Sequence, residues 1–99
     1  MRKNVRVDYT VRDDIALDEV TAAIREFVAG IAAHDPDHRY VSYQHATNPR
    51  SFTHVGSIAA SRLADLQAQP FFGAFGAFLR ARTERGPEVI WLEEVATAR

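Results

Sequence analysis

The first 34 residues carry two successive hydrophobic patterns with different periods. Apolar and polar side chains first alternate over residues 5–11, with the apolar positions at Val5, Val7, Tyr9 and Val11. A period of two over this length predicts a half-buried β-strand. Beyond the acidic break at residues 13–14, the apolar spacing becomes one, three and four, at Leu17, Val20, Ile24, Phe27, Val28 and Ile31. This spacing predicts an amphipathic helix, which ends near Pro36 because proline disfavours helical backbone in the residue before it.

Two further strands are predicted between residues 39 and 58. Residues 39–47 are rich in β-branched and aromatic types, and alternation divides them into two faces: Tyr40, Ser42 and Gln44 on one, Val41, Tyr43 and His45 on the other. Residues 48–51 (Asn-Pro-Arg-Ser) have the chemistry of a turn. Residues 52–58 form the next predicted strand, and the short turn between the two makes them a hairpin.

The following segment predicts two helical pieces and a last strand. The first piece covers residues 62–69, with Ser61 as its N-cap. Pro70 suits the first position of the second piece, whose large apolar residues share one face: Phe71, Phe72, Phe75, Phe78 and Leu79. The Arg-Gly-Pro sequence at 85–87 ends this helix, and residues 89–95 form the last strand.

Two glycines, Gly73 and Gly76, are unusual in the interior of the second helical piece. Glycine weakens a helix interior by about 0.5–1 kcal/mol relative to alanine. The pair therefore predicts either a close approach of this helix to the sheet or to a neighbouring chain, or space left for a ligand.

The predicted order is strand, helix, strand, strand, helix, strand, in a single domain covering residues 1–99. This is the βαββαβ order of the ferredoxin-like fold, an α+β class in which the helices cover one face of a four-stranded antiparallel sheet. The uncovered face is expected to mix polar and apolar residues: Arg6, Asp8, Tyr40, Ser42, Ile90 and Leu92. In a domain this small, such a face favours the pairing of two sheets in a homodimer.

Composition narrows the classes of function. Hydrophobic residues make up 46% and charged residues 25% of the chain, as in an ordinary globular domain. The net charge of −1 provides no strong field for nucleic acid or an anionic membrane. The chain has no cysteine, which excludes disulfides, iron–sulfur clusters and cysteine-bound zinc. With no secretory signal at the N-terminus and no run of about 18 apolar residues, a cytoplasmic protein is expected.

A family resemblance covers nearly the whole chain. Its best marker is Phe-Thr-His-Val-Gly at residues 52–56, followed by Pro-Phe-Phe-Gly-Ala-Phe at 70–75, Gly-Pro at 86–87 and a closing strand with Trp91. In these features the chain resembles the antibiotic biosynthesis monooxygenase (ABM) family of the dimeric α+β barrel superfamily. The resemblance implies dimers formed sheet to sheet. Some members oxidise phenolic polyketides or quinols with molecular oxygen and without metal or flavin, others degrade haem, and many have no assigned activity.

The chain departs from the family pattern in one respect. Related sequences commonly carry a histidine in the helix after the third strand, whereas residues 63–69 of this chain contain none. The resemblance therefore transfers no catalytic role for that histidine. It also supplies no axial ligand of the kind that a haem-degrading member would need from this helix.

Two histidines on the hairpin are the candidate catalytic residues. If His45 and His54 share a face, they provide a general base and its partner, or two metal ligands. A metal site would need a third ligand, for which Asp8, Glu93 and Glu94 are the strand carboxylates at hand. Alternatively, one histidine is hydrogen-bonded inside the pocket and the other is half-solvated. The prediction is an acid–base role without a metal.

Aromatic side chains are the candidate substrate-binding residues. The tyrosines and the tryptophan are expected to alternate inward on their strands and to bring polar tips into an apolar space. The phenylalanines complete the apolar wall of this pocket, although their spacing also suits an ordinary core. The candidate set is Tyr9, Tyr43, Phe52, Phe71, Phe75 and Trp91.

These features predict a cofactor-independent monooxygenase that oxidises an aromatic phenol- or quinol-type substrate with molecular oxygen. A deprotonated substrate supplies the electrons, so the protein needs only a dry pocket, a proton acceptor and an oxyanion partner. His54 or His45 would take the proton, while Tyr43 and Trp91 would orient the ring. The alternatives are a non-catalytic dimer that binds a small apolar or aromatic molecule, and a haem-binding or haem-degrading protein.

Overall fold

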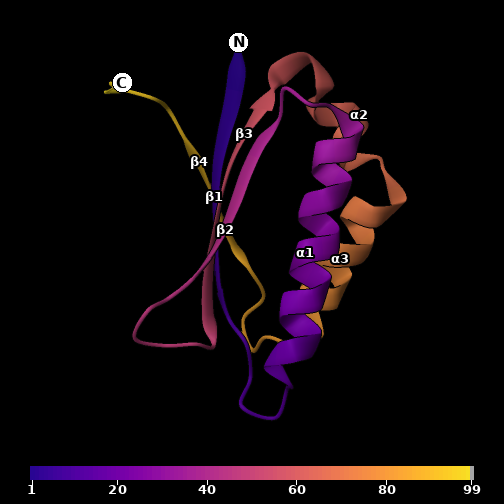
Figure 1. The fold of residues 1–99 in the computed structure, drawn as a ribbon, viewed down its shortest axis with the longest axis vertical. Helices are drawn as coiled ribbons and strands as arrows, with labels where there is room; N and C mark the ends of the chain where they lie inside the picture. The colour runs from indigo at the N-terminus through magenta and orange to yellow at the C-terminus, as the bar shows by residue number, and fades with distance from the viewer. Residues whose placement is uncertain (99) are drawn as a thin grey trace.

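The computed structural model describes residues 1–98 and has two layers, a four-stranded sheet with helices on one of its faces (Figure 1). Its elements are β1 (Arg2–Thr10), α1 (Leu17–His34), β2 (Arg39–Gln44), β3 (Ser51–Ala59), the short 3-10 helix η1 (Ala60–Arg62), α2 (Leu63–Gln67), α3 (Pro70–Arg80) and β4 (Glu88–Leu92). The strands follow the order β2-β3-β1-β4, and all neighbours are antiparallel. The structure confirms the ferredoxin-like α+β fold.

The core lies between the sheet and the two long helices, α1 and α3, which cover the same face (Figure 1). Helix α1 buries residues at the spacing that predicted it: Val20, Ile24, Phe27 and Ile31. Helix α3 begins with Pro70 in its first turn and buries Phe75 and Leu79. The rings of Phe27 and Phe75 stack with their centres 4.1 Å apart, which joins the two helices above the sheet.

Several predicted element boundaries differ from those in the structure. Strand β2 ends at Gln44 rather than at residue 47, and β4 ends at Leu92 rather than at residue 95. The ladder of β4 with β1 covers only Asn4–Asp8, so residues 93–95 have no paired strand beside them. Ser61 does not cap a helix, because it lies inside η1, and α2 begins at Leu63 without a side-chain cap.

The uncovered face of the sheet differs from the predicted one at two positions. Tyr40 and Ser42 lie on the helix side: the Tyr40 ring packs edge-on against Phe27 of α1, with ring centres 5.4 Å apart. The opposite set of β2 is solvent-exposed, with Val41 exposed by 46% and Tyr43 by 54%. Alternation had grouped these residues correctly, and only the assignment of the two groups to the two faces was reversed.

Two glycines outside α3 mark the close approaches in this fold. A Cβ atom on Gly56 of β3 would lie 2.8 Å from the Tyr40 ring, and one on Gly30 of α1 would lie 2.8 Å from the Phe71 ring. At Gly73 of α3, a Cβ atom would meet nothing within 4 Å. The glycine of β3 thus makes the room in which Tyr40 lies against the sheet, a role that the sequence had suggested for the glycines of α3.

Within residues 1–98, no helix combines the length and the apolar character that crossing a membrane requires.

Candidate functional site

His54 lies at the centre of a buried hydrogen-bond network on the helix side of the sheet. Its side chain belongs to the middle of β3 and is only 1% exposed. The hydroxyl of Tyr9 on β1 lies 2.8 Å from Nε2, and that of Tyr40 on β2 lies 3.0 Å from Nδ1. The Oγ of Ser42 is 3.3 Å from Nε2. Hydroxyl groups from the two strands that flank β3 therefore converge on one imidazole ring.

The strand register explains this convergence. Ser42 of β2 is paired directly with His54, and Val7 of β1 is paired with it from the other side. Directly opposed residues project from the same face of a sheet, and diagonal neighbours remain within reach of long side chains. Tyr9 and Tyr40 are two positions along their strands from those partners, so their long side chains reach back to the ring.

Burial fixes the charge state of this network. It lowers the pKa of His54 to about 4, because the imidazolium ion loses its hydration. Burial likewise raises the pKa values of Tyr9 and Tyr40 well above the ordinary range of a phenol. At neutral pH the ring is neutral, with one N–H and one lone pair, so it donates to one hydroxyl group and accepts from another.

A groove between α1 and the edge strand β2 reaches this network from outside. It has a volume of about 600 Å³, within the range typical of small-molecule sites. Six of its eleven lining residues are apolar, and the other five carry a hydroxyl, amide or guanidinium group. The lining residues are Thr21, Ile24, Arg25, Val28, Ala29, Ala32, Tyr40, Val41, Ser42, Gln44 and Phe52. Tyr40 and Ser42 therefore belong both to the groove and to the hydrogen-bond network of His54.

Four of the predicted substrate-binding residues lie on the helix side of the sheet, and one of them, Tyr9, is hydrogen-bonded to His54. Phe52 is buried beside Tyr9, with the two rings stacked 5.5 Å apart, and it also lines the groove. Phe75 is buried 5.9 Å from the His54 ring. Phe71 is partly buried and packs against Phe27 of α1 at 5.9 Å. Among these four, Phe52 is the one that borders the groove.

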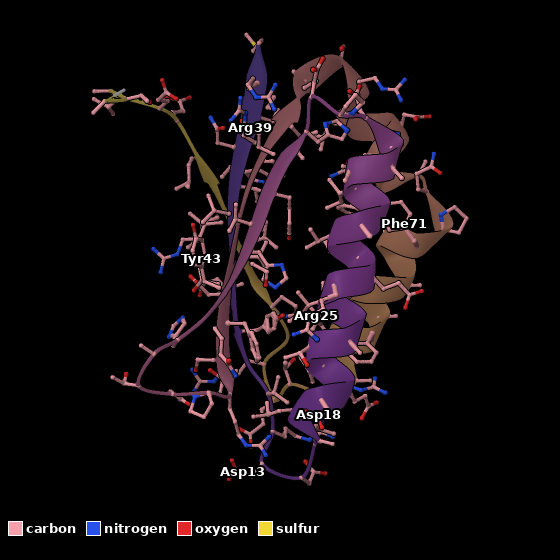
Figure 2. The ribbon with its side chains drawn as sticks, viewed as in Figure 1. Asp13, Asp18, Arg25, Arg39, Tyr43 and Phe71 are labelled. Atoms are coloured by element: carbon pink, nitrogen blue, oxygen red, sulfur yellow. The ribbon has the colours of Figure 1, made fainter. Side chains whose placement is uncertain are left out.

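Two other predicted lining residues do not reach this region. Tyr43 points away from the helices, on the uncovered face of the sheet (Figure 2). Trp91 is paired with Val5 on the outer strand β4 and is 52% exposed. The expectation of an inward side chain is wrong for Tyr43, because β2 is turned the other way. Trp91 shares the face of its partner Val5, but β4 lies at the edge of the sheet and leaves the side chain half-exposed.

The two candidate histidines face opposite sides of the sheet. The side chain of His45 is exposed, and its Nε2 lies 2.8 Å from the Oγ1 of Thr53, which donates to Asp8 at 2.7 Å. His54 and Thr53 are consecutive residues of β3, so their side chains project from opposite faces. The expectation of a shared face is therefore wrong, and the pair forms neither a base–partner arrangement nor a shared metal site.

No group of three or more histidine, aspartate, glutamate or cysteine side chains within the described part of the chain is arranged to hold a metal ion.

A second histidine cluster lies where α1 ends. Nδ1 of His34 is 3.0 Å from Nε2 of His38, and Nε2 of His34 is 2.7 Å from a carboxylate oxygen of Asp65. The ring centres are 5.2 Å apart and the planes differ by 8°, so the two imidazoles lie edge to edge in almost one plane. The buried Nδ1 of His38 has no hydrogen-bond partner among residues 1–98. The cluster joins α1, the start of β2 and α2.

The candidate site residues predicted from the sequence did not include Ser42 and Tyr40, because both were assigned to the uncovered face of the sheet. A usable signal was present in the hairpin. A hairpin pairs residues that lie equally far before and after the centre of its turn. With the centre near Asn48, Ser42 is paired with His54, as observed. Directly paired residues share a face, so the turn position together with an inward His54 would have placed both hydroxyl groups beside it.

No protein-family model matches the sequence, and no curated protein matches it. Many solved structures resemble the fold. One is described as an antibiotic biosynthesis monooxygenase, with a TM-score of 0.82, 18% identity, and coverage of 97% of this chain and 100% of that one. Another is SnoaB, a cofactor-independent oxygenase from Streptomyces nogalater, with a TM-score of 0.80, 17% identity, and coverage of 97% and 95%.

A third similar structure is that of Rv0793 from Mycobacterium tuberculosis, with a TM-score of 0.83, 18% identity and complete coverage of both chains. These matches extend over almost the whole of each chain, so the likeness concerns the complete domain. The chain therefore has the ferredoxin-like α+β fold of the antibiotic biosynthesis monooxygenases.

Proposed function

We propose that the protein is a cofactor-independent monooxygenase that oxidises an aromatic phenol- or quinol-type substrate with molecular oxygen. The observation that carries this proposal is the pair of hydroxyl groups, on Tyr40 and Ser42, that line the α1–β2 groove and contact the buried His54. A similar fold described as a cofactor-independent oxygenase adds support. The substrate lies in the groove, against Phe52 and the apolar side of α1.

The reaction needs no external reductant, because the substrate supplies all the electrons. Loss of the phenolic proton makes the ring electron-rich, and transfer of one electron to O₂ forms a phenoxyl radical and superoxide. Their combination forms a C–O bond to a ring carbon that bears hydrogen. Cleavage of the O–O bond then gives a quinone, and the phenolic and carbon-bound hydrogens leave in water. One phenol and one O₂ thus yield one quinone and one water.

The chain's own residues handle the first proton in this scheme. With the His54 proton on Nε2, the Tyr40 hydroxyl passes its own proton to the lone pair of Nδ1 as its oxygen takes the proton of the phenol. Ser42 stabilises the phenolate oxygen by hydrogen bonding. His54 thus holds the proton after transfer, although it reaches the substrate only through these two residues. His45 lies on the other face of the sheet and has no part in this scheme.

Oxygen uptake with a panel of anthrones and quinols tests the proposal. We expect Tyr40→Phe and Ser42→Ala each to lower kcat by about tenfold or more, as for the loss of a proton-transfer group. Tyr9→Phe is the matched control, because Tyr9 bonds to the same ring but does not line the groove. Absence of uptake with every substrate, or equal losses in all three variants, would refute the proposal.

The alternative function, a non-catalytic binding protein, is favoured by the pKa of His54. With a pKa of about 4, a full positive charge on this ring at pH 7 costs about 4 kcal/mol. A binding protein has no need of that charge. Thermal shift separates the two functions: a ligand present at about 100 times its Kd adds about 2.7 kcal/mol of stability, with no consumption of oxygen.

We propose further that the active form is a homodimer in which the uncovered sheet faces pair. Several large apolar side chains on that face are exposed by more than a third, and they span the strands β2, β3 and β4: Val41, Tyr43, Val55, Ile90 and Leu92. Two such faces packed together would bury these side chains and enlarge the small core of each domain.

A further inference from the structure

The α1–β2 groove carries a single type of charge. Arg25 is the one charged side chain that lines it within residues 1–98, and no carboxylate borders it. The other lining groups are apolar or carry neutral hydroxyl or amide groups. The formal charge of the groove lining is therefore +1, although the chain as a whole has a net charge of −1.

Within residues 1–98, Arg25 has no internal partner. The neighbours three and four residues away on a helix are the ones that pair with it. Here these are Thr21, Ala22, Val28 and Ala29, none of them acidic. Five other arginines hold carboxylates, whereas Arg25 is among those that hold none within residues 1–98: the five are Arg6, Arg12, Arg50, Arg62 and Arg82. The guanidinium of Arg25 is free to bind an anion from solution.

The position of Arg25 along the groove follows from the antiparallel course of α1 and β2. Arg25 precedes the end of α1 at His34 by nine residues, or about 13 Å of helix. Gln44 follows Arg39, the start of β2, by five residues, or about 16 Å of strand. Arg25 therefore lies roughly level with the Gln44 end of β2. Counted from the His34 end of α1, it lies farther along the groove than Tyr40 and Ser42. Figure 2 shows it in the half of α1 nearer Asp18.

We propose that the groove selects an aromatic carboxylic acid, with its carboxylate on Arg25 and its phenolic oxygen at Ser42 and Tyr40. This inference rests on the proposed function and adds the substrate class, a hydroxylated aryl carboxylate. A guanidinium binds a carboxylate through two parallel N–H···O bonds, which fixes the ring plane as well as the charge. Phe52 and the apolar residues of α1 contact the flat body of the ligand.

Direct binding measurements test this assignment without requiring turnover. The probes are 6-hydroxy-2-naphthoic acid and its neutral carboxamide, which have nearly the same shape, differ in charge and carry the hydroxyl group at the opposite end of the ring system from the carboxyl group. We expect the acid to bind the native protein about tenfold more tightly than the amide. Arg25→Gln is expected to remove this preference by lowering the affinity for the acid alone. Arg25→Lys is expected to retain part of the preference, since lysine keeps the positive charge but lacks the two parallel N–H donors of a guanidinium.

Arg85→Gln is the matched control, because Arg85 is also exposed and lies outside the groove. It removes the same charge and is expected to leave both affinities unchanged. Equal weakening of acid and amide by Arg25→Gln, an equal effect of Arg85→Gln, or failure of the native protein to bind the acid would overturn the inference. If the acid binds as expected but no oxygen is consumed, the proposed monooxygenase reaction fails while the assignment of Arg25 stands.

Discussion

Ser42 and His54 lie directly opposite each other in the β2–β3 ladder, with Oγ 3.3 Å from Nε2. The histidine is fully enclosed, whereas the serine borders the α1–β2 groove. This pair therefore connects a surface groove with a buried neutral imidazole through a single hydroxyl group. The acid–base group that the sequence indicated is present, but any ligand must reach it through its hydrogen-bond partners.

The buried His54 is expected to make folding stability depend on pH. Its folded pKa of about 4 lies below the unfolded value of 6.5, so below pH 6.5 the unfolded chain binds the proton more readily. The contribution is complete above pH 6.5 and is lost between pH 6.5 and 4, by about 3 kcal/mol. Urea unfolding at a series of pH values measures it. The variant His54→Gln has no titrating ring, and a difference between the two proteins that does not change with pH would contradict this assignment.

Two glycine substitutions are expected to change stability in opposite directions. Gly56→Ala places a methyl group 2.8 Å from the Tyr40 ring, and such overpacking costs about 1–3 kcal/mol. Gly73→Ala lies inside α3 with nothing within 4 Å, so it is expected to stabilise the protein by about 0.5–1 kcal/mol. Chemical denaturation measures both. Equal effects would show that Tyr40 is free to move away from β3.

The uncovered sheet face is expected to mediate association. Val55 lies in the middle of β3, 41% exposed and paired with the exposed Val41. Val55→Lys would bury a charge in the proposed interface, which is strongly unfavourable without a partner. Analytical ultracentrifugation should show a dimer for the native protein and a monomer for this variant. Ala77→Lys, on the exposed side of α3, is the control and should stay dimeric; a monomeric native protein would refute the interface.

The His34–His38–Asp65 cluster predicts specific tautomers. A carboxylate only accepts, so Nε2 of neutral His34 donates to Asp65, and its Nδ1 accepts from Nε2 of His38. Burial lowers the pKa of His38, against the opposing effect of Asp35. At pH 8 both rings should therefore carry their proton on Nε2. Long-range ¹H–¹⁵N NMR spectra report the tautomer directly, and a proton on Nδ1 of either ring would contradict this chain of bonds.

The local spacing of apolar residues was sufficient to predict the type and order of the helices and strands in this fold. The spacing of six apolar residues between Leu17 and Ile31 predicted α1. Four of the six are buried, and Leu17 and Val28 are partly buried against the core. Pro70 predicted the start of α3 correctly because its fixed φ and missing N–H suit a first turn. The order of these elements was enough to predict the ferredoxin-like arrangement, since few topologies satisfy it.

The composition of the site was decided by long-range packing. Alternation separated Tyr40 and Ser42 from Tyr43 and His45 correctly, but nothing within β2 indicated which group faces the helices. That choice depends on the register with β3 and on the position of α1, which involve residues far apart in the chain. The sequence by itself thus determined the elements and their order, because these depend on local spacing. Only the tertiary structure separated His45 from His54 and brought Tyr9, Tyr40 and Ser42 around the buried ring.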